Sequence, residues 1–426
     1  MNVGCIPTKA LVRAAEIAHG ARHGHEFGVR ATVEIDGPAV MARVHKVVAH
    51  GRGFYEELLE RNDVLRIHGH GRFRDGALVV TDDDGETELR GVPTVLAVGA
   101  RPWIAPIPGV DAASFITSDD LINLSDLPAS LAICGAGPIA VEFAQALNRL
   151  GVQVTLVLRS DLPLRGEEPE ARETLLRVLQ DEGVRVIPGA RRIAARDVPG
   201  GTELSWIGGS VTAEKVLVAT GREPRLDESD PAEAGIALLD GGAKVNAQMA
   251  TTARGVWALG DAIGGDHRRF QFTHVATYEG PQVAENALRG AHHEPAYMGM
   301  PRVTFTDPEV AAVGLTEAEA CDQGINVHAH VKLVRETGKA RAVGATEGFV
   351  KVVIDRASGK LVGATIMASH AGDMLATLTI PLHTRNGDLG PVLATTFAHP
   401  TLSEAIKVAV RDAVASSPAP EAEMTT

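Results

Sequence analysis

The stretch Ser130–Arg159, SLAICGAGPIAVEFAQALNRLGVQVTLVLR, decides the fold. It begins with a short apolar run, Ser130–Cys134, followed by the glycine-rich turn GAGPIA and a helical pattern that extends to Leu150. Gly151 ends the helix, and Val152–Leu158 is a second apolar run. A strand, a turn, a helix and a strand within about 30 residues predict an α/β protein with a parallel sheet.

The turn has the spacing Gly135-x-Gly137-x-x-Ala140, which is typical of dinucleotide-binding sites. Gly135 permits the tight turn, Gly137 allows the backbone to approach a pyrophosphate, and the small Ala140 lets the helix pack on the strand. The phosphates would lie at the helix N-terminus, where N–H groups and the helix dipole favour anions. The alternative is a glycine-rich turn of any other α/β protein.

The end of the second strand indicates which nucleotide binds. NAD sites usually place an acidic residue there for the ribose 2′-hydroxyl, but this chain has Leu158 followed by Arg159, with Arg165 shortly after. Two guanidinium groups suit a 2′-phosphate, so NADP(H) is favoured over NAD(H). Alternatively, both arginines are solvated loop charges.

Outside this unit, the alternation of helical and strand patterns continues with a helix over 168–182 and strands at Val184–Ile187 and Lys215–Ala219. Helices are also expected over 5–19 and 38–61. Residues 64–100 predict a short β-meander of three strands, Val64–His68, Ala77–Thr81 and Thr94–Val98, with a turn at Asp82–Gly85. Phe349–Ile354 and Lys360–Met367 predict a hairpin in a separate C-terminal segment, 299–411.

The 426-residue chain carries 41 Lys and Arg against 54 Asp and Glu, a net charge of −13 that disfavours nonspecific binding to nucleic acid. It has no run of 18 apolar residues and no secretory signal pattern, so we expect no membrane partner. The three cysteines, Cys5, Cys134 and Cys321, are too few for a disulfide framework and fit a reducing cytoplasm. A cytoplasmic α/β enzyme of two or three domains is the interpretation that these properties leave.

Cys5 lies at or just before the N-terminus of a helix, where the dipole stabilises a thiolate. Lys9, one turn later, could add positive charge. A buried structural cysteine is an equally good interpretation of Cys5 taken alone. We expect Cys134 and Cys321 to be core thiols.

The segment His399-Pro-Thr401-Leu-Ser-Glu404 has two interpretations. Thr401 followed three residues later by Glu404 is a capping-box pattern that would open the terminal helix. Alternatively, His399 is an acid/base group oriented by a carboxylate. The His-x-His pairs at 23/25 and 68/70 have no carboxylate or thiol nearby to complete a ligand set, so we predict no metal site.

Together these segments resemble the FAD-dependent pyridine nucleotide–disulfide oxidoreductases, a family that includes dihydrolipoamide dehydrogenase, glutathione reductase and mercuric reductase. The resemblance covers essentially the whole chain. It is carried by MNVGCIPTK (1–9), AVGARP (97–102), ATGREP (219–224), TARGVWALGD (252–261) and the segment from Pro301 through FTDPEV (305–310) to Gly314. These look like the redox-active segment, two glycine turns, the second flavin motif and the start of the dimerisation domain.

The resemblance implies a role for each matching residue. Cys5 would be the thiol next to FAD, and Lys9 and Glu142 would form an ion pair near the flavin. Asp261, after Gly260, would hold the ribityl chain of FAD, while Gly99 and Gly221 belong to the two glycine turns. His399 and Glu404 would form an acid/base pair that transfers protons to and from thiols at the site of the other subunit in a homodimer.

The chain also departs from the family pattern. The partner cysteine of the family would lie immediately before Met1, and the strand–glycine turn–helix unit that binds the ADP half of FAD would precede it. We therefore expect a late start codon or a fragment, and we expect the chain as written to lack disulfide exchange. Mercuric reductases usually end with a cysteine pair, whereas the last cysteine here is Cys321, so mercury is a less favoured substrate than a disulfide.

We therefore expect two nucleotide-binding Rossmann-like domains, the first incomplete, and a C-terminal α+β dimerisation domain. We expect an incomplete FAD domain at 1–128, an NAD(P) domain at 129–245 and a return segment of the FAD domain at 246–298. The dimerisation domain is expected at 299–411 and a disordered tail at 412–426. The expected function is transfer of hydride from NADPH through FAD to a cysteine pair that reduces a small disulfide. The alternatives are an NAD-linked dihydrolipoamide dehydrogenase, a mercuric-reductase-like enzyme, or a non-catalytic nucleotide-binding dimer.

Overall fold

The computed structural model describes residues 2–110 and 113–416, and these form two compact units. The first unit contains the residues up to Pro7, Val44–Ala105 and Thr220–Ala296. The second contains Thr8–Arg43, Pro106–Ala219 and the residues from Tyr297 onward. Two long helices occupy the N-terminal part of the chain, α1 (Cys5–His23) and α2 (Gly37–Arg61), close to the expected ranges.

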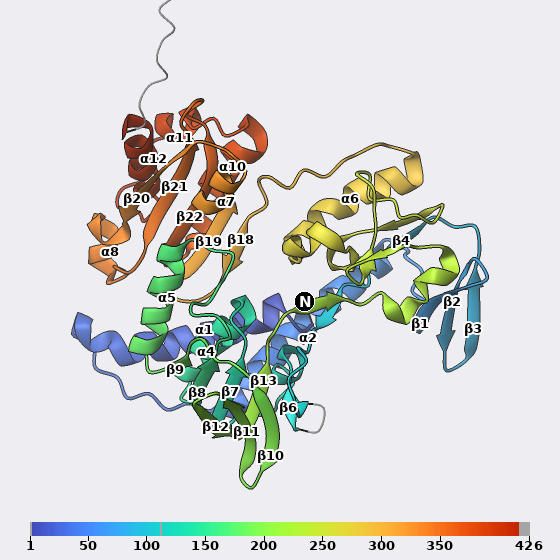
Figure 1. Cartoon of the computed structure of the whole chain (residues 1–426), viewed down its shortest axis with the longest axis horizontal. Coiled ribbons are helices and arrows are strands. Elements are labelled where there is room, and N and C mark those ends of the chain that lie inside the picture. Colours follow the sequence, from blue (N-terminus) through green and yellow to red (C-terminus); the bar gives the residue numbers. More distant parts are fainter. Residues whose placement is uncertain (1, 111–112, 417–426) are drawn as a thin grey trace, which may run out of the picture. The chain divides into compact units, whose positions relative to one another are not determined.

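A five-stranded parallel sheet organises the second unit (Figure 1). Its strands run in the order β6 (Phe115–Ile116), β13 (Lys215–Val218), β7 (Ser130–Cys134), β8 (Gln153–Val157) and β9 (Arg185–Ile187). The apolar runs of β7 and β8 are almost wholly buried, as expected for strands that are covered on both faces. Two helices complete the alternation, α4 (Pro138–Arg149) and α5 (Pro169–Asp181), each with a proline in its first turn. The predicted strand–turn–helix–strand unit and the α/β class are confirmed.

Between β9 and β13 the chain forms an antiparallel meander that the sequence reading did not identify. Its strands are β10 (Ala194–Val198), β11 (Gly201–Trp206) and β12 (Gly209–Ala213). They carry mixed polar and apolar side chains, so their pattern is weaker than that of the buried parallel strands.

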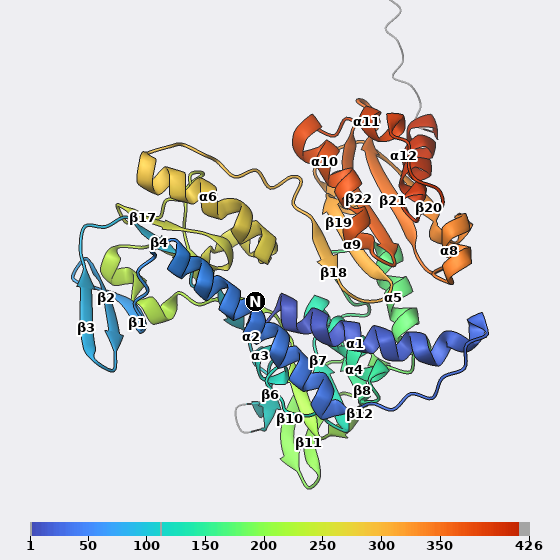
Figure 2. The ribbon, with the colours of Figure 1, turned by 180° about the vertical axis from the view of Figure 1, so that it is seen from behind.

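The C-terminal part of the second unit is a five-stranded antiparallel sheet. Its order is β18 (Arg302–Thr304), β19 (Glu309–Gly314), β22 (Leu361–Ala368), β21 (Phe349–Asp355) and β20 (Val327–Leu333), and the predicted β21–β22 hairpin is present. Seen from behind in Figure 2, one face carries helices α9 (Ala371–Met374), α10 (Ala376–Arg385), α11 (Gly390–Ala394) and α12 (Glu404–Ser416).

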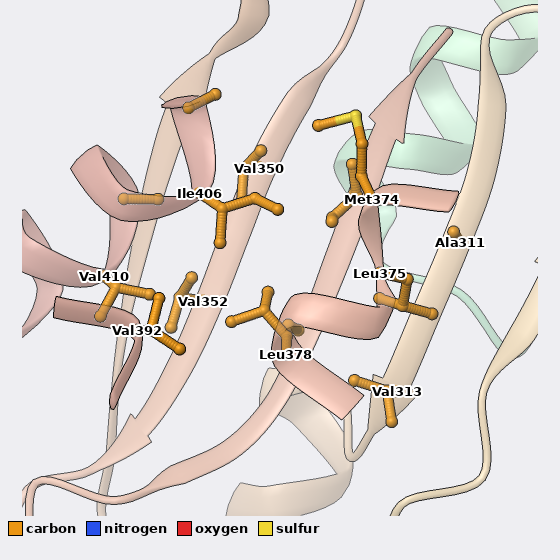
Figure 3. Packing of buried hydrophobic residues seen from close by; sticks show 14 of the residues in the cluster. Ala311, Val313, Val350, Val352, Met374, Leu375, Leu378, Val392, Ile406 and Val410 are labelled. Atoms are coloured by element: carbon orange, nitrogen blue, oxygen red, sulfur yellow. The ribbon is translucent and has the colours of Figure 1, made fainter. Parts of the chain in front are cut away.

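Alternate strand residues and these helices build a core of aliphatic side chains, among them Val350, Val352, Leu378 and Ile406 (Figure 3). Every second residue of β21 therefore faces the helices, as the pleat requires. Helix α12 extends to Ser416, past the expected start of the tail at residue 412, because Ala413 is still buried in this core. The rest of the expected tail, 417–426, lies outside the described residues.

The first unit contains short sheets. The meander is β1 (His70–Arg74), β2 (Ala77–Asp82) and β3 (Gly85–Leu89), with the expected turn between β2 and β3. The strand expected at Val64–His68 is wrong: Val64 and Leu65 are exposed, and β1 begins only where β2 offers backbone partners.

The strand expected at Thr94–Val98 is shorter, β4 (Thr94–Leu96), and it does not belong to the meander. It pairs in parallel with β17 (Val256–Ala258), and helix α6 (Thr273–Arg289) packs against both. A second pair, β5 (Ala100–Pro102) with β14 (Arg222–Pro224), is antiparallel. No helix within the described ranges combines the length and apolar character needed to cross a membrane.

Candidate active site

The glycine turn between β7 and α4 has the geometry of a phosphate cradle. Gly135 has φ +156°, and a Cβ there would lie 2.2 Å from the carbonyl oxygen of Ala219, so no side chain fits. A Cβ on Gly137 would meet nothing within 4 Å, and no side chain caps the helix N-terminus at this residue. The open space beside an uncapped helix N-terminus fits the pyrophosphate of a nicotinamide dinucleotide. Ala140 is fully buried against the turn.

The loop with the two arginines is bound directly to this turn. Leu164 donates its N–H to the carbonyl of Ala136 at 2.8 Å, which holds the loop beside the cradle. Arg159 and Arg165 are both exposed, and neither pairs with a carboxylate among residues 2–110 and 113–416. Leu158 is fully buried, so its side chain offers nothing to a ribose.

Lys9 and Glu142 lie together in the second unit. The Lys9 ammonium is 2.8 Å from Oε2 of Glu142, whose side chain is only 6% exposed. The other oxygen of Glu142 accepts the backbone N–H of Phe305 at 2.8 Å, and the Lys9 ammonium lies 4.1 Å from the centre of the Phe305 ring. Both oxygens of the buried Glu142 carboxylate therefore have a partner, and Lys9 is held by the ion pair with Glu142 and by the contact with the Phe305 ring.

In the first unit, Cys5 is the first residue of α1, as expected, and its thiol is exposed. The sulfur lies 3.3 Å from the hydroxyl oxygen of Thr273, which is the first residue of α6. The thiol therefore has a hydrogen-bond partner from a second helix start.

The Gly260–Asp261 turn also belongs to the first unit. Gly260 has φ +59°, and its N–H is donated at 2.6 Å to Glu279, a fully buried residue of α6 whose other oxygen lies 3.1 Å from His267. Burial raises the pKa of the Asp261 carboxyl, and Arg222 opposes that shift. Asp261 accepts no hydrogen bond from the described residues, so an acceptor is available, as the ribityl hydroxyls of FAD require.

The glycines of the two other turns connect β5 and β14 in the first unit. Gly99 accepts the N–H of Arg225 at 3.0 Å, and Gly221 accepts the N–H of Trp103 at 2.9 Å. Both glycines have positive φ, +71° and +141°. The two turns therefore hold each other in place.

His399 and Glu404 form a hydrogen-bonded pair in the second unit. The imidazole Nδ1 lies 2.9 Å from Oε1 of Glu404, and Oε2 accepts the N–H of Thr401 at 2.9 Å. These bonds lower the pKa of the Glu404 carboxyl. Of the capping-box pattern, the bonds among the described residues include only the one from the Thr401 N–H to Glu404, and the Thr401 hydroxyl donates to the carbonyl of Ala398. The His399 side chain is 78% exposed.

The other two thiols differ from each other. Cys134 is a core thiol in β7, and burial raises its pKa to about 11. The expectation for Cys321 is wrong: the thiol is exposed, because the short helix α7 (Glu317–Asp322) buries Ala320 and turns the next residue to solvent.

The structure adds three residues that the sequence reading did not single out, Thr273, Phe305 and Glu279. Each acts through one long-range contact, with Cys5, Lys9 and Gly260 respectively. Phe305 and Glu279 offered weak sequence signals: Phe305 is the aromatic residue that begins the motif FTDPEV, and Glu279 is an acidic residue within a helix. Thr273 offered none.

Comparisons with known proteins agree with this architecture. A model described as "Pyridine nucleotide-disulphide oxidoreductase" matches residues 1–280, and its dimerisation-domain counterpart matches residues 300–410. A mercuric reductase of Streptomyces lividans is 32% identical, over 96% of this chain and 88% of the relative. A dihydrolipoyl dehydrogenase of Geobacillus stearothermophilus is also 32% identical, over 95% and 86%.

Solved structures give the same result. The HOCl-induced flavoprotein disulfide reductase RclA of Escherichia coli, as its Cu(II) complex, superposes with a TM-score of 0.83 at 26% identity, over 97% of this chain and 89% of that one. LpdA of Mycobacterium tuberculosis gives 0.86 at 25% identity, over 96% and 90%. A family model that spans well over half of the sequence, together with relatives that match along nearly all of it, shows that this chain belongs to the pyridine nucleotide-disulphide oxidoreductase family.

Proposed function

We propose that the protein is an FAD-dependent disulfide reductase that prefers NADPH and acts as a homodimer. The observation that carries this proposal is the exposed Cys5 thiol at the start of α1, with Thr273 at hydrogen-bond distance and Lys9 one helical turn further on. Bound FAD would supply two-electron transfer from nicotinamide to a disulfide that Cys5 forms with a second cysteine, and the resulting pair of thiols would reduce the disulfide substrate.

Other residues would hold the cofactors. The glycine turn around Gly135 and Gly137 would bind the pyrophosphate of NADPH, and Asp261 would accept hydrogen bonds from the ribityl chain of FAD. Lys9, fixed by Glu142, would present a positive charge to the flavin ring.

The nucleotide preference follows from the loop beside the cradle. Arg159 and Arg165 are exposed and unpaired within the described ranges, on a loop that Leu164 fastens to the glycine turn. Two guanidinium groups in this place suit a 2′-phosphate, which NADPH carries and NADH lacks.

The test measures binding of both nucleotides to the double variant Arg159→Ala/Arg165→Ala. We expect the Kd for NADPH to rise roughly 10- to 100-fold, as for lost hydrogen bonds to a charged group, with the Kd for NADH within about twofold. Arg185→Ala is the control, because this exposed arginine begins β9 at the opposite end of the sheet. Tighter binding of NADH than of NADPH by the unaltered protein would refute the preference.

His399 would act as the acid/base group toward substrate thiols of the partner subunit's site. Glu404, kept ionised by its hydrogen bonds, accepts the Nδ1–H, so the proton is taken up and released at Nε2. In a form of the protein that carries the second cysteine beside Cys5, we expect His399→Ala to lower disulfide-dependent NADPH oxidation by roughly two orders of magnitude or more. Unchanged turnover would refute this role.

The His399–Glu404 pair also favours a second candidate, an NAD-linked dihydrolipoamide dehydrogenase. Oxidation of dihydrolipoamide with NAD⁺, faster than any NADPH-dependent disulfide reduction, would support it. A third outcome is also informative: protein that stays colourless after FAD is added, or whose flavin is not bleached by excess NADPH or NADH, would indicate a chain without redox activity.

A further inference from the structure

Helix α4 carries three buried polar side chains on one stripe. Glu142, Gln145 and Arg149 follow the spacing i, i+3, i+7, and each is at most 5% exposed. All three reach the same short segment, Phe305–Asp307, which precedes β19. Buried polar groups are costly unless they are paired, so their common target calls for an explanation.

Together the stripe binds the backbone of this segment. Glu142 accepts the N–H of Phe305 at 2.8 Å. Gln145 accepts the N–H of Asp307 at 2.7 Å and donates to its carbonyl at 2.8 Å, and Arg149 binds the Asp307 carboxylate at 2.9 Å. The segment can shift only if several partly buried hydrogen bonds break, so the backbone at Phe305 is held against α4.

The Phe305 ring lies beside the Lys9 ammonium, 4.1 Å from ring centre to nitrogen. A carboxylate alone leaves a lysine free to turn about its flexible stem, because ammonium hydrogen bonds have no preferred plane. A ring face on another side restricts that freedom through cation–π attraction.

We propose that Phe305 is a positioning residue for Lys9: its ring, carried by a backbone segment that the polar stripe of α4 holds, fixes the ammonium that Glu142 neutralises. The purpose of this arrangement rests on the proposed function, in which Lys9 faces the flavin. The contact between Phe305 and Lys9 does not depend on the proposed function, and it can be tested without flavin or nicotinamide.

The experiment methylates the lysines of the full chain reductively, with ¹³C-formaldehyde and a borohydride, which keeps their charge, and observes the N-methyl signals by NMR. Lys9→Arg identifies the Lys9 signal, and exposed Lys360 provides the reference. We expect the Lys9 signal upfield of Lys360 because of the ring current. Phe305→Leu should abolish this difference, and Phe305→Tyr should retain it.

A second readout is the acylation rate of Lys9 relative to Lys360, followed by mass spectrometry. Phe305→Leu should accelerate it roughly two- to fivefold, and Phe305→Tyr should leave it close to the unaltered value. A Lys9 signal and rate that Phe305→Leu does not change, or that Phe305→Tyr changes equally, would overturn the proposal.

Phe305→Trp covers the case in which the leucine variant fails to fold. A larger aromatic face should move the Lys9 signal further upfield and slow its acylation, and a downfield or unmoved signal would overturn the proposal. Loss of the NADPH preference, measured separately with the arginine variants, would leave this result untouched, so the two failures are distinguishable.

Discussion

The surroundings of Cys5 show how much one contact adds at the scale of a single residue. The sequence places the thiol at a helix start, but the hydroxyl of Thr273, 268 positions further along, completes its environment. A thiolate can only accept a hydrogen bond, so Thr273 would then be the donor.

Removing that donor should slow the chemistry of the thiol. We expect Thr273→Val, which keeps the shape of the side chain, to reduce the rate of Cys5 alkylation at neutral pH by about two- to tenfold, the worth of one hydrogen bond. Thr273→Ser is the matched control and should react at nearly the unaltered rate. Equal rates for the valine and serine variants would contradict the assignment. Iodoacetamide labelling followed by peptide mass spectrometry measures both.

A second residue-scale effect concerns Cys134. Burial raises the pKa of this thiol from 9.0 to about 11. The folded protein keeps the thiol protonated while the unfolded chain ionises it, so stability is intact below pH 9 and falls as the pH rises from about 9 to 11.

The expected loss is roughly 1.4 kcal/mol per pH unit within that window. Urea unfolding at pH 7 and pH 10 should show this extra decline in the unaltered protein and not in Cys134→Ala. A decline of equal size in both proteins would assign it to other groups.

At the scale of elements, the sequence predicts structure well where the pattern is local, and it does not predict which distant strands pair. The β7–α4–β8 unit could be predicted because strand, turn and helix follow one another within one segment. The pairing of β4 with β17 could not be predicted, since it joins short strands about 160 residues apart, and the sequence pattern of neither strand indicates its partner. The same holds for the site: the glycine turn is local, whereas Thr273, Phe305 and Glu279 act only through the fold.

The turn before α4 allows its two glycines to be separated experimentally. Gly135→Ala would place a Cβ against the Ala219 carbonyl at positive φ, and we expect a loss of stability of about 1–3 kcal/mol. Gly137→Ala meets open space, so stability should change by less than about 0.5 kcal/mol. Its methyl group would occupy the phosphate cradle, so NADPH binding should weaken roughly tenfold or more. Unfolding curves and nucleotide titrations distinguish the two, and unimpaired binding by Gly137→Ala would refute the cradle.

A buried ionic cluster joins three elements of the second unit. Lys351 on β21 is 4% exposed and pairs with Glu168, Glu170 and Glu317 at 3.0, 2.8 and 2.9 Å. Desolvation alone would lower the pKa of Lys351, but the three carboxylates raise it overall.

Lys351→Met should therefore cost about 3–5 kcal/mol, because Glu168 would remain buried without its partner. Lys332→Met is the control. Lys332 lies on β20 of the same sheet and makes a more exposed pair with Glu336, worth about 1 kcal/mol or less. Chemical unfolding measures both, and a similar small loss for each variant would contradict this account.

At the scale of the whole molecule, the dimerisation-domain match predicts an assembly of two chains. We expect light scattering at micromolar concentration to give about twice the chain mass of 44.8 kDa. A mass of one chain across the accessible concentrations would contradict the prediction.

Helix α4 connects the glycine turn with the surroundings of Lys9. Its N-terminus borders the glycine cradle, and Glu142, on its second turn, grips both Lys9 and the Phe305 backbone. A small tilt of helix α4 on binding of a dinucleotide would move Glu142 and, through the ion pair, the Lys9 ammonium. By thermodynamic reciprocity, weakening the grip on Lys9 would alter how tightly the dinucleotide docks. If the glycine turn binds the dinucleotide and Lys9 faces the flavin, as we propose, helix α4 would couple nucleotide binding to the charge beside the flavin.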